Sequence, residues 1–105
     1  MILYGLLVPA VMCPLNQISK VSFTSPKEIL GDACTFIGAC VEINLVFMSQ
    51  AQTEHYHDLP INNNLPPRAI SNAVFEEGLD IRGNILIIRT SDKGHISDIN
   101  ISDFN

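Results

Sequence analysis

The sequence has little charge and no concentration of positive charge. Of its 105 residues, 16% are charged, and 11 acidic residues outnumber 6 basic residues to give a net charge of −5. Phosphate backbones and anionic membrane surfaces are bound by clusters of Lys and Arg, and the sequence contains no such cluster. We therefore expect no nucleic-acid partner and no membrane partner, and we interpret the acidity as a source of solubility.

A long apolar run is also missing. The longest one, from Ile2 to Cys13, is interrupted by Gly5 and Pro9 and is shorter than the ~20 residues that cross a bilayer. A signal peptide would need a positive N-terminal region, whereas the first basic residue is Lys20, and no small-x-small cleavage site follows the run. The pattern favours a cytoplasmic protein over a secreted one.

The sequence has an odd number of cysteines. The sequence has 3, at Cys13, Cys34 and Cys40, and an odd number argues against a disulfide framework. Cys34 and Cys40 could join only if the chain reversed direction between them, for which Gly38 is the available position. Both have apolar neighbours, which would suppress thiolate formation, so we expect reduced, buried thiols and not nucleophiles paired with a histidine.

Familiar catalytic motifs are absent as well. The segment 78–83 has two glycines, but no Lys-Ser or Lys-Thr follows it, so it is not a phosphate-binding loop. Glu76 and Glu77 are adjacent, so their side chains diverge and do not form a hydrolase pair. The sequence has no Gly-x-Ser-x-Gly motif. These observations favour a protein without enzymatic activity.

Hydrophobic residues make up 47% of the sequence, enough for one small globular domain spanning residues 1–105. Apolar patterning predicts about five strands, bounded by turn residues. We expect a β-rich α+β fold: a small antiparallel or mixed sheet, either open or closed into a compact barrel, with one or two short helices. The predicted strands cover residues 2–8, 20–24, 41–48, 84–90 and 95–101. One short helix is predicted to begin at residues 25–28, and a second is predicted over residues 69–77.

One segment concentrates chemically active side chains, and it comprises Glu54, His55, Tyr56, His57 and Asp58. In an extended chain the two histidines would point the same way, ~6.6 Å apart, and could bind a divalent metal together with a carboxylate. The His-x-His pair resembles that of cupin-type metal sites and carbonic anhydrases, but the glutamate and glycines that accompany it in cupins are missing from residues 59–62. A polar surface loop and a pH-sensitive contact are the alternatives.

The long connection over residues 49–68 suggests a second kind of site. Its prolines stiffen an extended apolar segment, which reduces the entropy lost on docking. We expect a non-enzymatic binding or protein-interaction module without a cofactor, whose partner is another protein or a second copy through a sheet edge. The alternatives are a small metalloprotein or enzyme using His55 and His57, and a structural or regulatory subunit. The candidate binding residues are Tyr56, Leu65, Pro66, Pro67 and Arg68.

Overall fold

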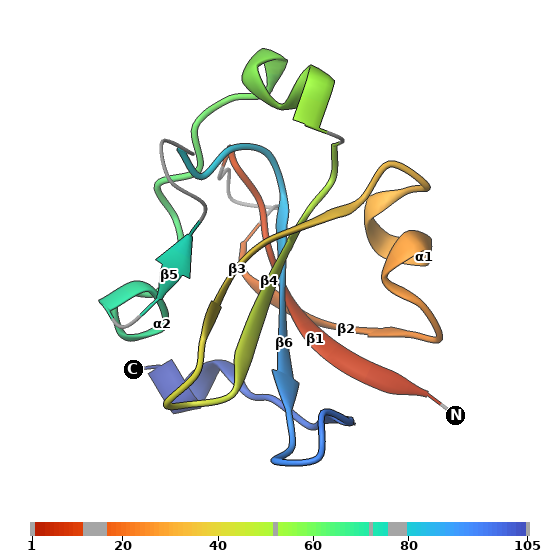
Figure 1. The fold of residues 1–105 in the computed structure, drawn as a ribbon, viewed down its shortest axis with the longest axis vertical. Helices are drawn as coiled ribbons and strands as arrows, with labels where there is room; N and C mark the ends of the chain where they lie inside the picture. The colour runs from red at the N-terminus through yellow and green to blue at the C-terminus, as the bar shows by residue number, and fades with distance from the viewer. Residues whose placement is uncertain (1, 12–16, 52, 72, 76–79, 105) are drawn as a thin grey trace.

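The strand predicted over residues 84–90 forms the centre of the molecule (Figure 1). The structure, a computed structural model, describes residues 2–11, 17–51, 53–71, 73–75 and 80–104. Within these residues seven strands form one antiparallel sheet in the order β2-β1-β6-β4-β3-β5, and β7 also pairs with β6. The β-rich prediction is confirmed, but the sheet is open and not a barrel, and it has more strands than the five expected.

Two α-helices and two 3₁₀ helices accompany the sheet, and none of the described helices is long and apolar enough to cross a membrane. Figure 1 shows α1 on one side of the strands, with α2 and β5 on the other. The elements are β1 (Leu3–Val8), β2 (Ser19–Phe23), α1 (Pro26–Leu30), β3 (Thr35–Cys40), β4 (Leu45–Ser49), η1 (Thr53–Asp58), α2 (Pro67–Ser71), β5 (Val74–Phe75), β6 (Ile85–Thr90), β7 (Ile96–Ser97) and η2 (Ile101–Phe104).

The run Ile85–Ile88 in β6 is buried on both faces, as its continuous apolar sequence predicted. Side chains alternate between the two faces of a strand, so Ile85 and Ile87 join one apolar cluster while Leu86 and Ile88 join another. Helix α1 packs against β6 and β2 and contributes Leu30 to the second cluster. The first cluster is closed by side chains from outside the sheet, namely Tyr56, Leu65, Ala69 and Ile99.

The strand predicted over residues 41–48 is wrong in its first half. A hairpin occupies this region, with β3 ending at Cys40 and β4 beginning at Leu45. Residues 41–44 form the turn, in which Asn44 adopts a φ of 54° and Val41 is 82% exposed. The apolar alternation continued through the turn because Val41 and Ile43 are apolar, so it predicted one longer strand. The turn forms at Asn44 because asparagine tolerates the left-handed conformation that this turn needs.

The remaining predicted elements differ mainly in length. Ser25 caps α1, and Gly31 ends it at a φ of 89°, as expected. The helix predicted over residues 69–77 begins earlier, at Pro67, and ends at Ser71, while residues 72 and 76–79 lie outside the described part of the chain. The returning strand predicted over residues 95–101 is shorter in the structure, where β7 spans only two residues.

The C-terminal segment is attached to β2 through an ion pair. The Lys20 ammonium lies 2.7 Å from Asp98 Oδ1 and donates a hydrogen bond to Asn100 Oδ1 at 3.0 Å. The same ammonium stands over the Tyr4 ring, 5.0 Å from its centroid. The hydrogen bond from Lys20 is the main reason that the pKa of Asp98 lies below its usual value.

Gly38 allows β5 to join the sheet. A Cβ atom added to Gly38 would lie 2.7 Å from the carbonyl oxygen of Val74 and 3.1 Å from Phe75 Cα. We predict that Gly38→Ala lowers the free energy of unfolding by about 1–3 kcal/mol, the usual cost of overpacking, as measured by urea denaturation. Val74→Ala is the control, because that side chain is 73% exposed and should change stability by less than about 0.5 kcal/mol. Equal stability of Gly38→Ala and the wild type would show that β5 moves aside freely.

The Asp98 ion pair should make stability depend on pH in the acidic range. A carboxyl group whose pKa is lowered by folding stabilises the protein above its unfolded pKa, and this contribution disappears as the pH falls through the folded pKa. Asp98→Asn should therefore melt below the wild type at neutral pH, and the difference in melting temperature should vanish in acid. A melting-temperature difference that is constant from neutral to acidic pH would contradict this role of the ion pair.

Candidate functional site

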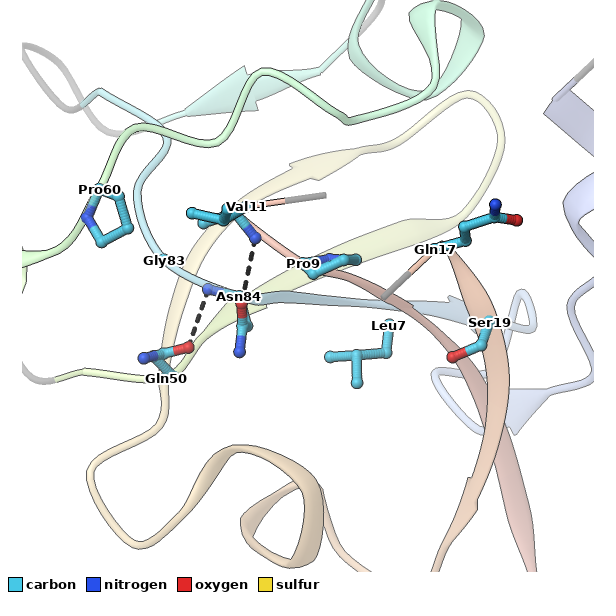
Figure 2. A pocket seen from close by; sticks show the side chains of 10 residues that line it. Leu7, Pro9, Val11, Gln17, Ser19, Gln50, Pro60, Gly83 and Asn84 are labelled. Carbon is cyan, nitrogen blue, oxygen red and sulfur yellow. Dashed lines mark hydrogen bonds between the residues drawn. The ribbon is translucent and has the colours of Figure 1, made fainter. Parts of the chain in front are cut away.

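A cleft of about 370 Å³ lies at one end of the sheet. Neighbouring antiparallel strands run in opposite directions, so this end gathers the last residues of β1 and β4 and the first residues of β2 and β6. Figure 2 shows the side chains around it. The lining residues are Leu7, Pro9, Ala10, Val11, Gln17, Ser19, Gln50, Pro60, Gly83 and Asn84.

The lining is electrically neutral. The described lining residues include no Asp, Glu, Lys, Arg or His, although the chain as a whole carries a net charge of −5. Apolar side chains such as Leu7 and Val11 are combined with the amides of Gln17, Gln50 and Asn84. Small-molecule sites are lined mainly by apolar side chains with a few placed polar groups, and have volumes of ~300–1,000 Å³; in this cleft polar and apolar residues contribute about equally. The cleft lies at the lower end of that range.

Two hydrogen bonds fix the side-chain amides of Asn84 and Gln50 in one orientation (Figure 2). The backbone N–H of Ala10 donates to Asn84 Oδ1 at 3.0 Å, and the backbone N–H of Asn84 donates to Gln50 Oε1 at 2.9 Å. A side-chain amide has an acceptor oxygen and a donor nitrogen. Backbone donors occupy the oxygens of Asn84 and Gln50, so their nitrogens remain as the donors of the cleft. Among the described residues, neither of these nitrogens has a hydrogen-bond partner.

The walls of the cleft are held by a run of asparagines that sequence analysis did not single out. Asn62 is 4% exposed, and its amide nitrogen donates to the carbonyl oxygens of Val8 and Gly83 at 3.0 and 2.9 Å. The amide nitrogen of Asn64 donates to Pro9 and Ala10 at 2.9 and 3.0 Å. The end of β1 is thereby joined to the loop before β6. The available signal was three adjacent asparagines between two short apolar, proline-containing segments, residues 59–61 and 65–67.

The predicted metal ligands lie on η1, away from the cleft lining. Glu54, His55, His57 and Asp58 are exposed, and His55 Nδ1 lies 3.8 Å from Asp58 Oδ2. In a 3₁₀ helix with three residues per turn, side chains two positions apart point in different directions, unlike the extended arrangement considered for this pair. Within the described residues, no group of three or more His, Cys, Asp or Glu side chains is placed to hold a metal ion. Metal binding stays a prediction.

The predicted binding residues divide into buried and exposed ones. Tyr56 and Leu65 are 1% and 6% exposed and belong to the first apolar cluster. Pro66 is also buried, which leaves Pro67 and Arg68 as the exposed members. The loop therefore packs across its own sheet: Ile61 pairs with Arg82, and the Asn62 N–H donates to Ile81. Partner binding by Pro67 and Arg68 stays a prediction.

The described cysteines are free, as expected, but Cys34 is half-buried and not buried as predicted. Cys40 is buried, and its thiol donates to the carbonyl oxygen of Ala69 in α2. Burial is the largest cause that raises the pKa of the Cys40 thiol, and Glu42 adds to it. Both causes favour the thiol over the reactive thiolate. Cys13 lies outside the described residues.

The Tyr56 hydroxyl connects η1 to the loop before β6. It accepts a hydrogen bond from the backbone N–H of Arg82 at 2.7 Å, while the Arg82 guanidinium donates to the carbonyl oxygen of Leu59 at 3.0 Å. Burial raises the pKa of Tyr56, opposed by the bond from Arg82, so the hydroxyl stays neutral. The Gly83 N–H also donates to the Pro60 carbonyl oxygen at 2.8 Å, so Pro60 and Gly83 lie next to each other in the cleft lining.

Comparisons with known proteins add no relative to this description. Scans of the chain against protein-family models, curated proteins and solved structures each found no match.

The Tyr56 hydroxyl can be tested against a matched tyrosine. Tyr56→Phe removes the acceptor and leaves the Arg82 N–H without its partner, so the free energy of unfolding should fall by about 1–3 kcal/mol. Tyr4→Phe is the control, because Tyr4 is 42% exposed. Removal of its hydroxyl should lower the free energy of unfolding by less than about 0.5 kcal/mol. Urea denaturation of both variants gives the comparison. Equal losses would mean that the hydroxyl bond contributes nothing to stability.

Proposed function

We propose that this protein is a non-enzymatic binding module that takes a small uncharged molecule in the cleft at the end of the sheet. The observation that carries the proposal is the fixed orientation of the Asn84 amide. Its oxygen is occupied by the Ala10 N–H, and Figure 2 shows its nitrogen directed away from that bond, into the space bordered by Gln50 and Leu7. A ligand would receive a hydrogen bond from this nitrogen.

The chemistry of the lining defines the ligand class. A donor nitrogen selects a ligand with a carbonyl or hydroxyl oxygen as acceptor. The apolar surfaces of Leu7, Pro9 and Val11 favour a compact hydrocarbon body beside that oxygen. Among the lining residues that the structure describes, no carboxylate compensates a cation, so a positively charged ligand would lose its hydration without gaining a partner. Small lactams, amides and related neutral carbonyl compounds satisfy all three conditions.

Binding is tested by NMR titration of the protein with δ-valerolactam and, separately, with piperidine, which has the same ring size but is a cation at neutral pH and has no acceptor oxygen. We expect the lactam to shift the backbone amide signals of Ala10, Gly83 and Asn84 with a dissociation constant in the millimolar range, as suits so few atoms. Piperidine should leave these signals unchanged. Equal shifts with both compounds, or none with the lactam, would contradict the proposal.

The Asn84 donor is tested by Asn84→Asp. The carboxylate keeps an acceptor for the Ala10 N–H but replaces the donor nitrogen by an oxygen, so the lactam affinity should fall by roughly tenfold. Asn63→Asp is the matched control, because Asn63 is exposed and does not line the cleft, yet the variant acquires the same charge. If Asn84→Asp binds the lactam as tightly as Asn63→Asp, the amide of Asn84 is not the donor.

A further inference from the structure

Strand β2 presents an open edge of the sheet. It pairs with β1 along all five of its residues, from Leu3 opposite Phe23 to Leu7 opposite Ser19. It is the terminal strand in the sheet order, and among the described residues no backbone hydrogen bond reaches its other side. The opposite end of the sheet differs, because β5 offers only two residues. An unpaired strand edge carries a row of N–H and C=O groups that can pair with another chain.

The features that usually protect such an edge are missing from β2. The strand contains no proline, and its pairing with β1 runs without a bulge. An outward lysine commonly prevents edge pairing, but the Lys20 ammonium is bound to Asp98 and Asn100 of its own chain and lies over the Tyr4 ring. The lysine therefore folds back over the sheet, and the Asp98 carboxylate offsets part of the charge that would repel an incoming strand.

We propose that two copies of this chain pair through β2, with the two strands antiparallel around a two-fold axis at Val21. In this register Val21 faces Val21 of the second copy, Lys20 faces Ser22, and Ser19 faces Phe23. The interface is isologous, since each copy contributes the same residues. The two sheets join into one continuous sheet, and the edge groups of both β2 strands gain hydrogen-bond partners.

The charges of β2 suit a second copy of the same strand. Lys20 is the only charged residue in β2, and the register places it opposite the neutral Ser22, so no like charges face each other. The two chains still repel at long range because each carries a net charge of −5. Salt screens that repulsion, so the dimer should be tighter at high ionic strength.

The oligomeric state is tested by sedimentation analysis of the full chain over a range of concentrations. We expect a reversible monomer–dimer equilibrium. Ser22→Lys places a cation opposite Lys20 of the other copy, twice in each dimer, and should weaken the dimer by about fivefold. Ser22→Glu creates two attractive pairs and should tighten it by a similar factor. The matched controls are Asn63→Lys and Asn63→Glu, which change the net charge equally at an exposed loop position.

Ser22 is exposed, so both variants should keep the wild-type circular dichroism and melting temperature, and a change in association then reports on the edge itself. Opposite effects of Ser22→Lys and Ser22→Glu, each relative to its Asn63 control, would support the pairing. A monomer at every concentration would overturn the proposal, as would a dimer whose affinity follows net charge alone. None of these outcomes depends on ligand binding in the cleft.

Discussion

The burial of β6 on both faces is the constraint on which the rest of the structure depends. A strand with four consecutive buried apolar residues needs a cover on each side and a partner strand at each edge. The chain supplies β1 and β4 as partners and α1 as the cover of one face. The second face is covered by parts far apart in sequence, which include Tyr56, Ala69 and Ile99. The long connection over residues 49–68, the middle loop, therefore contributes side chains to the core.

The packing of the middle loop into the core explains why the cleft forms at this end of the sheet. The middle loop must pass the end of the sheet to reach the second face, and it does so alongside the residues that precede β6. Peptide groups brought together there cannot all join a strand ladder, so the buried Asn62 amide satisfies two of them. The amides of Gln50 and Asn84 extend the same polar network to the cleft surface. Packing and the candidate site thus share one set of hydrogen bonds.

The sequence predicted the parts of this fold that depend on local patterns. The continuous apolar run of β6, the Ser25 cap of α1 and the glycine turn before β7 are each specified by neighbouring residues. The β3–β4 hairpin was missed because its turn has apolar residues at Val41 and Ile43. The cleft could not be predicted, because it is formed by residues from four strand ends and a loop whose meeting depends on strand order, which sequence periodicity does not contain. Tyr56 and Leu65 were predicted to bind a partner because they lie in a long connection stiffened by prolines, whereas long-range packing buries them.

The thiol of Cys40 provides a chemical view of motion in this structure. It is fully buried and bonded to the Ala69 carbonyl, so an alkylating reagent reaches it only when α2 separates from the end of β3. Cys34 is half-buried and free, so it needs a smaller opening to react. The labelling rate of Cys40, divided by the rate for the same thiol in the unfolded chain, gives the free energy of that local opening under native conditions. The buried Cys40 is thereby a built-in reporter of how often α2 leaves the core.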